Sequence, residues 1–182
     1  MFITFVIFIK KEKEMFTKKM EEAINQQIVR EMYSSNLYLA MASYFHSHNL
    51  NGFANWMRVQ AQEETMHATK FFDYIISRSG KAKIGKIEGT PCEWESPLKA
   101  FEDAFEHEKF ITQSINDLAD VALQEKDHAT MNMLNWFIDE QVEEEANTSE
   151  IVDRLKLIAD SKSGLFMMDN ELKTRQLSPA TV

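Results

Sequence analysis

Polar residues interrupt four otherwise apolar helical stripes of this sequence, each near its middle. The stripes emerge when long periodic segments are read in alternating steps of four and three residues, which trace the face that a helix turns toward a core. The inward-facing polar residues are Glu31, Glu64 with His67, Glu108, and Gln141 with Glu144. Carboxylates and one imidazole on facing helices suit a pair of iron or manganese ions, because these ions prefer hard oxygen ligands and glutamate can bridge them.

These carboxylates would be costly in a core without a cation. Burying one unpaired carboxylate costs several kcal/mol, and mutual repulsion raises that cost when several lie together. The four stripes carry no Lys or Arg that would neutralise them. A single Glu-x-x-His pair is weak evidence for a metal site, because such pairs also occur on solvated helix surfaces. Here the pair coincides with polar interruptions in three other stripes, and together they predict a dinuclear metal site.

Further polar residues lie beside this set. Glu63, Glu140 and Glu143 cluster with Glu144, and such a cluster is either a solvated acidic face or a secondary iron position. Tyr38 follows Glu31 by two turns on the same stripe, where it either hydrogen-bonds to a metal ligand, donates an electron or simply packs in the core. We assign no role to the remaining histidines, which are His46, His48, His107 and His128.

The elements that must position these residues are long helices. Pro and Gly are rare, at 3 and 5 residues, so breakers are few and an all-α fold is expected. Ser96 as a cap followed by Pro97 should begin the third helix, and Asn51 should cap the second. The predicted helices run from about 18 to 48, 52 to 79, 97 to 125 and 128 to 159, with a break at 161–164 and a short helix at 165–176.

The loop lengths predict the topology. Short turns after the first and third helices make two antiparallel hairpins. The middle connection of about 17 residues reaches about 56 Å when extended, whereas a helix of about 28 residues is about 42 Å long. The connection can therefore cross the whole bundle, which leaves the second and third helices parallel. We expect a four-helix bundle with one long crossover and a short fifth helix.

Composition narrows the classes of function. The formal net charge is −9, which disfavours a nucleic-acid partner and fits either plain solubility or attraction of metal cations. Cys92 is the only cysteine, so an intramolecular disulfide, a CxxC motif and an iron–sulfur cluster are excluded, and a cytoplasmic location is expected.

The amino terminus is unusual. Residues 2–9 are apolar and are followed by lysines, but they are too few to span a bilayer and lack the features of a signal peptide. We expect residues 1–14 to be an extension outside the fold, with Met15 as the functional start and residues 15–182 as one domain. A weak membrane or export signal is the alternative, although no membrane partner is otherwise expected.

Five segments of the chain closely resemble bacterial non-haem ferritins, and the resemblance covers roughly residues 15–176. The segments are REMYSSNLYLAM (30–41), AQEETMHATKFFDYI (61–75), FEHEKFIT (105–112), NWFIDEQVEEEA (135–146) and GLFMMDNEL (164–172). The resemblance implies a ferritin-like bundle that forms a hollow shell of 24 identical subunits, oxidises Fe(II) with O2 or H2O2 as a ferroxidase, and stores the ferric mineral.

The same resemblance implies roles for individual residues. Glu31, Glu64 and His67 correspond to ligands of a first iron, with Glu64 bridging, and Glu108 and Glu144 to ligands of a second. Gln141 and Tyr38 match a glutamine and a tyrosine beside the centre. A third iron position corresponds to Glu63, Glu140, Glu143 and Glu144.

Related proteins fit less well. Bacterioferritin-like chains carry a second Glu-x-x-His on the fourth helix, and their haem-ligating Met falls at Thr65, so no haem is expected. Rubrerythrins would add CxxC pairs, and mini-ferritins lack the fifth helix. The main rival function is a passive shell subunit without its own oxidase activity. Other di-metal enzymes and an acidic helical scaffold are further alternatives.

Overall fold

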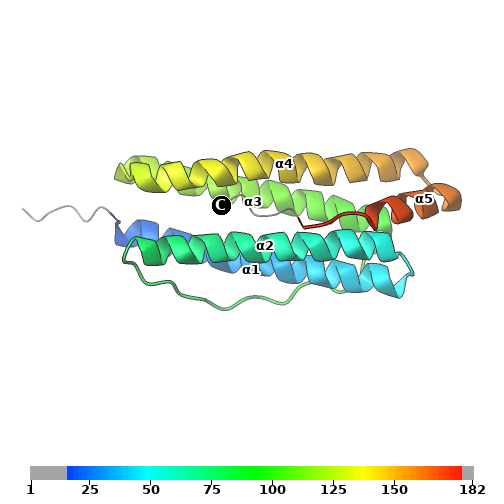
Figure 1. The fold of residues 1–182 in the computed structure, drawn as a ribbon, viewed down its shortest axis with the longest axis horizontal. Helices are drawn as coiled ribbons and strands as arrows, with labels where there is room; N and C mark the ends of the chain where they lie inside the picture. The colour runs from blue at the N-terminus through cyan, green and yellow to red at the C-terminus, as the bar shows by residue number, and fades with distance from the viewer. Residues whose placement is uncertain (1–15, 178–182) are drawn as a thin grey trace, which may run out of the picture.

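Residues 16–177 fold into four long helices and a fifth short one (Figure 1). The computed structural model describes residues 16–177, and the predicted extension at residues 1–14 lies outside that range. The helices are α1 (Lys18–Ser47), α2 (Asn51–Ser77), α3 (Pro97–Glu125), α4 (His128–Ile158) and α5 (Lys162–Leu172). None of the helices in the described range is both long and apolar enough to cross a membrane.

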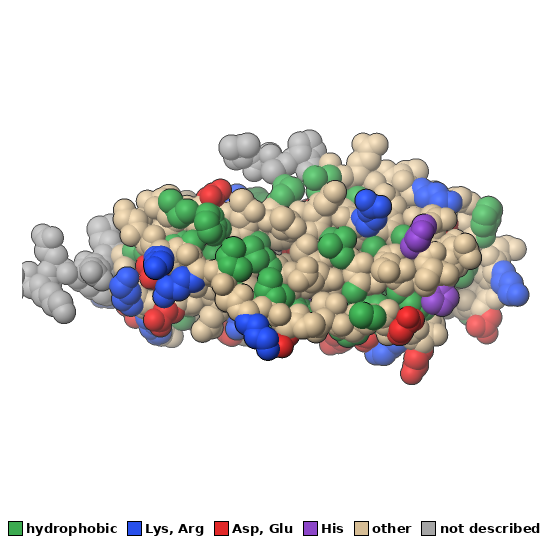
Figure 2. Space-filling view, turned by 90° about the horizontal axis from the view of Figure 1, so that it is seen from below, with side chains coloured by type: hydrophobic (Ala, Val, Ile, Leu, Met, Phe, Trp, Pro, Cys, Tyr) green, Lys and Arg blue, Asp and Glu red, His purple; other side chains and the backbone are tan. Residues whose placement is uncertain are grey.

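The topology is the predicted one. Helices α1 and α2 form one antiparallel hairpin and α3 and α4 the other, and the chain between α2 and α3 runs the length of the bundle (Figure 1). Helices α2 and α3 therefore run in the same direction. Apolar side chains gather on the face that α1 and this crossover form, among both acidic and basic groups (Figure 2). The all-α fold class and its single long crossover are confirmed.

Local capping explains most helix starts. The side chains of Ser96, Asp127 and Ser161 each accept a hydrogen bond from the backbone N–H three residues later, at 3.1 Å. Proline follows Ser96 at the first position of α3, as predicted. Because Ser161 caps α5, the helix begins at Lys162, so the predicted break at 161–164 is wrong. The helix ends at Leu172, so the predicted range 165–176 is wrong as well.

Helix α2 begins differently from the prediction. Asn51 is the first residue of the helix and not its cap, and the preceding Leu50 offers no capping side chain. Instead, Asp169 of α5 accepts hydrogen bonds from the backbone N–H groups of Gly52 and Phe53, at 2.6 and 3.2 Å. A β-carbon on Gly52 would lie 1.6 Å from the carbonyl oxygen of Asp169, so glycine is what lets α5 approach this closely.

The core divides into two apolar clusters. One lies near the α1–α2 turn and includes Phe45, Phe53 and Phe101, whose ring centroids are 5.3 to 5.8 Å apart. The other lies toward the opposite end and includes Phe71 and Phe137, which stack at 3.9 Å. The predicted stripes extend from Ile24 to Phe45, from Phe53 through Gln60 to Tyr74, from Phe101 through Phe105 to Leu118, and from Leu134 to Leu155. They are buried along their length, apart from Tyr74 and Phe105, which are half-buried.

Candidate metal centre

A layer of buried polar side chains separates the two apolar clusters. Each of the four long helices contributes at least one carboxylate, and all are between 1% and 5% exposed. The layer falls where each stripe predicted a polar interruption, because the residues on either side are apolar and set the same helical face inward. Its members are Glu31, Glu64, His67, Glu108, Gln141 and Glu144.

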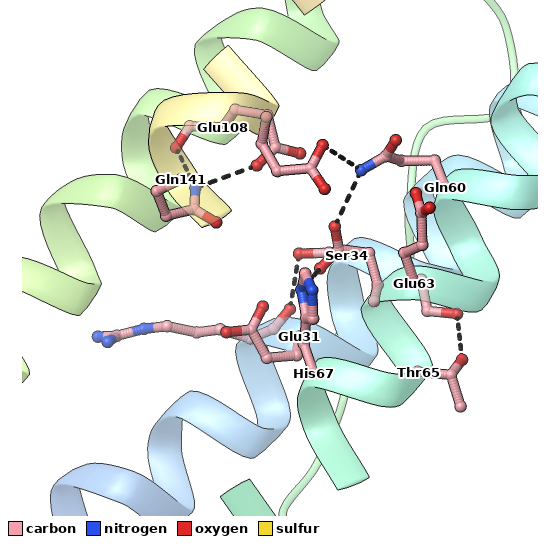
Figure 3. Close-up of polar contacts among 12 residues, drawn as sticks. Glu31, Ser34, Gln60, Glu63, Thr65, His67, Glu108 and Gln141 are labelled. Atoms are coloured by element: carbon pink, nitrogen blue, oxygen red, sulfur yellow. Dashed lines mark hydrogen bonds and ion pairs between the residues drawn. The ribbon is translucent and has the colours of Figure 1, made fainter. Parts of the chain in front are cut away.

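Glu31, Glu64 and His67 form a compact group in this layer. One ligand atom from each lies within 4.8 Å of the others. Glu64 and His67 are one helical turn apart on α2, with His67 Nδ1 3.5 Å from Glu64 Oε2, and Glu31 faces them from α1 (Figure 3). Three side chains with oxygen and nitrogen donors at this spacing are able to surround one cation.

Glu108 and Gln141 form the opposite side of the layer. Gln141 Nε2 donates to the carboxylate and to the carbonyl oxygen of Glu108, both at 3.3 Å (Figure 3). The Tyr38 hydroxyl donates a short hydrogen bond to the same carboxylate. Burial, reinforced by the charge on Glu108, raises the pKa of Tyr38 well above its usual range, so the phenol stays protonated and remains a donor. The predicted contact of Tyr38 with a carboxylate of the layer is therefore present.

Gln60 connects the two sides of the layer. Its Nε2 lies 2.6 Å from Glu144 Oε2 and 3.4 Å from Glu64 Oε1, so one amide orients carboxylates from α2 and α4 (Figure 3). On α1, Gln27 Nε2 donates to Glu31 Oε1 at 2.9 Å. Neither glutamine was assigned a role from the sequence, although Gln60 lies on the predicted stripe. An amide one turn before an inward carboxylate is the signal that would have identified both.

His107 was also missed. Its Nε2 lies 2.8 Å from Ser34 Oγ, and its ring contacts the edge of Tyr38. Burial lowers the pKa of His107 from 6.5 to about 4, so the ring is neutral at physiological pH. It packs behind Tyr38 and Glu108 without adding charge to the layer.

Burial and mutual repulsion make the ionised form of this layer unfavourable. Burial, with repulsion from Glu64, raises the pKa of both Glu31 and Glu108 from 4.5 to about 8. Burial also raises the pKa of Glu64 and of Glu144. Among residues 16–177, the basic side chain that contacts these carboxylates is His67. Glu31 and Glu108 are therefore largely protonated near neutral pH unless a cation replaces their protons.

Iron fits the donors that are present. Glu31 Oε2 and Gln60 Oε1 are buried without a hydrogen-bond partner, although such atoms are normally paired. A metal ion would supply the missing partner of Glu31 Oε2. The mixture of several carboxylates with one imidazole and no thiolate matches iron or manganese rather than a structural zinc site.

The predicted third cluster is only partly assembled. His67, Glu140 and Glu144 bring one ligand atom each within 4.8 Å of one another. Glu63 is half-buried and forms an ion pair with Arg175 at 2.5 Å, and Glu143 is exposed.

Comparisons with known proteins agree with this architecture. The family model for the ferritin-like domain matches residues 21–158. The bacterial non-haem ferritin of Bacteroides fragilis is 47% identical, over 88% of this chain and 100% of the relative. That of Campylobacter jejuni is 38% identical, over 90% of this chain and 98% of the relative.

A solved structure agrees as well. The open-pore ferritin of the hyperthermophilic archaeon Archaeoglobus fulgidus superposes with a TM-score of 0.89 at 52% identity, covering 90% of this chain and 99% of that one. Sequence and fold thus lead to the same assignment over most of the chain, and the protein is a member of the ferritin family.

Proposed function

We propose that this protein stores iron and oxidises it at a dinuclear ferroxidase centre, inside a shell of 24 identical subunits. The observation that carries the proposal is the buried layer of carboxylates from all four helices, which no lysine or arginine pairs with among the described residues 16–177. Glu31, Glu64 and His67 would hold one Fe(II), and Glu108 and Glu144 the second, with Glu64 between them. The absence of a thiolate and the excess of hard oxygen donors favour Fe(III) over Fe(II), which drives the oxidation.

The reaction is a two-electron oxidation of two substrate ions. Each Fe(II) gives up one electron, and O2 accepts both electrons and two protons to leave as H2O2. When H2O2 is the oxidant, it accepts two electrons and two protons and leaves as two molecules of water. Because the pKa values of Glu31 and Glu108 are about 8, these carboxyls release protons when iron binds. Their protons are thus available inside the site.

The remaining side chains position the ligands. Gln60 holds Glu144 and Glu64 by hydrogen bonds, and Tyr38 holds Glu108. Such outer contacts fix the orientation of ligands and commonly change metal affinity or activity by about 10- to 100-fold. Tyr38 also remains a candidate electron donor, because its protonated phenol contacts a ligand directly.

Assembly has support from the surface. Large apolar side chains are more than half exposed in a single subunit, which is typical of a surface that another copy covers. They include Leu39, Ile84 and Phe110, at 51%, 57% and 52%. We propose a cytoplasmic location, in keeping with the single exposed cysteine, Cys92.

The test is aerobic addition of Fe(II) to the metal-free protein while ferric absorbance and particle mass are followed together. Glu64→Gln and His67→Ala should slow oxidation by about 100-fold or more and leave the assembly intact. Glu88→Gln is the matched control, because Glu88 is exposed and pairs only with Lys86 among the contacts described. Unchanged rates in the Glu64 and His67 variants would refute the site. A passive shell subunit would assemble but oxidise iron no faster than buffer.

A further inference from the structure

The segment that follows α5 turns back along α2 and is held there (Figure 1). Asn55 of α2 directs its Nδ2 group at three carbonyl oxygens of this turn, those of Leu172, Lys173 and Arg175, at 3.2, 3.4 and 3.0 Å. A single amide thus fixes the path of the tail. Arg175 is the residue that this path delivers to the middle of α2.

The Arg175 side chain is held on three sides. Its guanidinium lies over the ring of Trp56 at 4.2 Å, and its Nη1 donates to the carbonyl oxygen of Trp56 at 3.3 Å. Its Nη2 donates to Glu63 Oε2 at 2.5 Å. The Arg175 side chain is 19% exposed and that of Glu63 is 16% exposed. An ion pair this well covered is stronger than an ordinary surface pair.

Glu63 lies where acidic side chains of α2 and α4 meet. Burial raises its pKa and the charge of Arg175 lowers it, while Glu140 and Glu143 raise it further, so these acids lie near enough to repel one another. The adjacent group of His67, Glu140 and Glu144 has its ligand atoms within 4.8 Å. Glu63 is not a member of that group, because its carboxylate is directed to Arg175 instead.

We propose that Arg175 is an internal counter-ion that holds the Glu63 carboxylate away from a third metal position between α2 and α4. This inference rests on the proposed function. A third metal ion beside Glu140, which the Glu144 carboxylate would share with the pair, gains Glu63 as a ligand only when the guanidinium leaves. The third position is therefore weaker than the dinuclear pair and fills after it. Arg175 is a positioning residue, since it contacts Glu63 and none of the proposed ligands of the pair.

The experiment uses Zn(II), which does not change oxidation state, on the metal-free assembled protein. Calorimetric titration gives the affinity of each site, and anomalous diffraction from crystals shows which residues hold the ion and where Glu63 points. Arg175→Gln should tighten the third site about tenfold, because one charge-assisted hydrogen bond no longer competes for Glu63. The Glu63 carboxylate should then turn toward Glu140. Arg175→Lys, which keeps the charge, should bind Zn(II) much as the wild type does.

Arg154→Gln is the matched control. It removes the same charge from another ion pair, in which Arg154 Nη2 lies 2.5 Å from Glu171 of α5, and it does not contact Glu63. Its third site should be unchanged. Asn55→Ala is a second test that leaves the charge in place: it frees the tail and should tighten the third site by less than Arg175→Gln does. This variant keeps the inference testable even when Arg175→Gln fails to assemble.

The outcomes separate the two levels of the argument. Two results together support the inference. Zn(II) binds at Glu31, Glu64 and His67 in every variant, and the third site binds Zn(II) more tightly in Arg175→Gln but not in Arg154→Gln. If Zn(II) occupies the pair but Arg175→Gln leaves the affinity of the third site unchanged or weakens it, the inference is overturned and the proposed function still stands. Absence of Zn(II) from the pair in the wild type overturns the proposed function itself.

Discussion

Replacing Glu31 with glutamine should stabilise the metal-free protein near neutral pH while it disables iron oxidation. Glu31 is 1% exposed, and its pKa is raised from 4.5 to about 8, first by burial and then by Glu64. At pH 7 the carboxyl is ionised in the unfolded chain but protonated in the folded one. The difference between the unfolded pKa of 4.5 and pH 7 therefore costs folding on the order of 3 kcal/mol.

Glutamine avoids that cost because it does not ionise in either state. Its amide oxygen still accepts from Gln27, as Glu31 Oε1 does at 2.9 Å. Its NH2 group occupies the position of Oε2, which accepts no hydrogen bond and lies near the Glu64 carboxyl, and a poorly paired buried donor there costs about 1 to 2 kcal/mol. The expected net stabilisation at pH 7 is therefore about 2 kcal/mol.

The sign of the pH dependence makes this prediction specific. The folded pKa lies above the unfolded one, so the penalty on wild type is absent below pH 4.5, grows as pH rises and is complete above pH 8. Glu31→Gln should therefore be neutral or slightly destabilising at pH 5. Its advantage should be largest above pH 8, where the penalty on wild type reaches about 4 to 5 kcal/mol before the amide correction.

Chemical unfolding of chelator-treated protein at one fixed protein concentration, repeated from pH 5 to above pH 8, measures this difference. Glu88→Gln, at an exposed ion pair, should show no such trend. A Glu31→Gln difference that is constant with pH, or that turns destabilising as pH rises, would refute the electrostatic reasoning. Zn(II) should reverse the order, because it stabilises wild type more than the variant.

Three further changes test separate contacts. Gln60→Leu removes the amide that orients Glu144 and should slow oxidation by about 10- to 100-fold, as stopped-flow absorbance would show. Tyr38→Phe removes the donor to Glu108 and should slow oxidation while the folded assembly keeps its mass in light scattering; an unchanged rate would restrict Tyr38 to packing. Asp169→Ala should lower stability by about 1 to 2 kcal/mol in thermal unfolding by removing the cap of α2, with no change in oxidation rate.

Most of the helix boundaries and the core layer were predictable because their signals are local. Ser96 followed by Pro97 marks the start of α3 without reference to any other element, and the inward direction of Glu108 follows from its apolar neighbours on one helix. The crossover followed from lengths alone. Because the long helices keep a regular periodicity, a polar residue in an otherwise apolar stripe must also face the core.

The cap of α2 and the ion pair of Arg175 were missed because their contacts join residues far apart in sequence. The cap of α2 comes from Asp169, which lies 117 residues after Gly52, so no local pattern around Asn51 reports it. The pairing of Arg175 with Glu63 likewise depends on how α5 docks and where its tail then runs. Sequence periodicity describes the face that a helix buries, but it carries no information about which distant side chain completes a helix end or an ion pair.

The division of the core into two clusters explains how the bundle tolerates a layer that destabilises it. Phe45, Phe53 and Phe101 on one side and Phe71 and Phe137 on the other are each at most 1% exposed, and burying such a ring stabilises the fold by roughly 1.5 to 3 kcal/mol. Because the apolar clusters close both ends of the layer, the helices stay in place when the carboxylates carry protons instead of metal. Under the proposed function, iron would therefore enter and leave the site without unfolding the protein, because protons and cations would exchange within a frame that packing at both ends holds fixed.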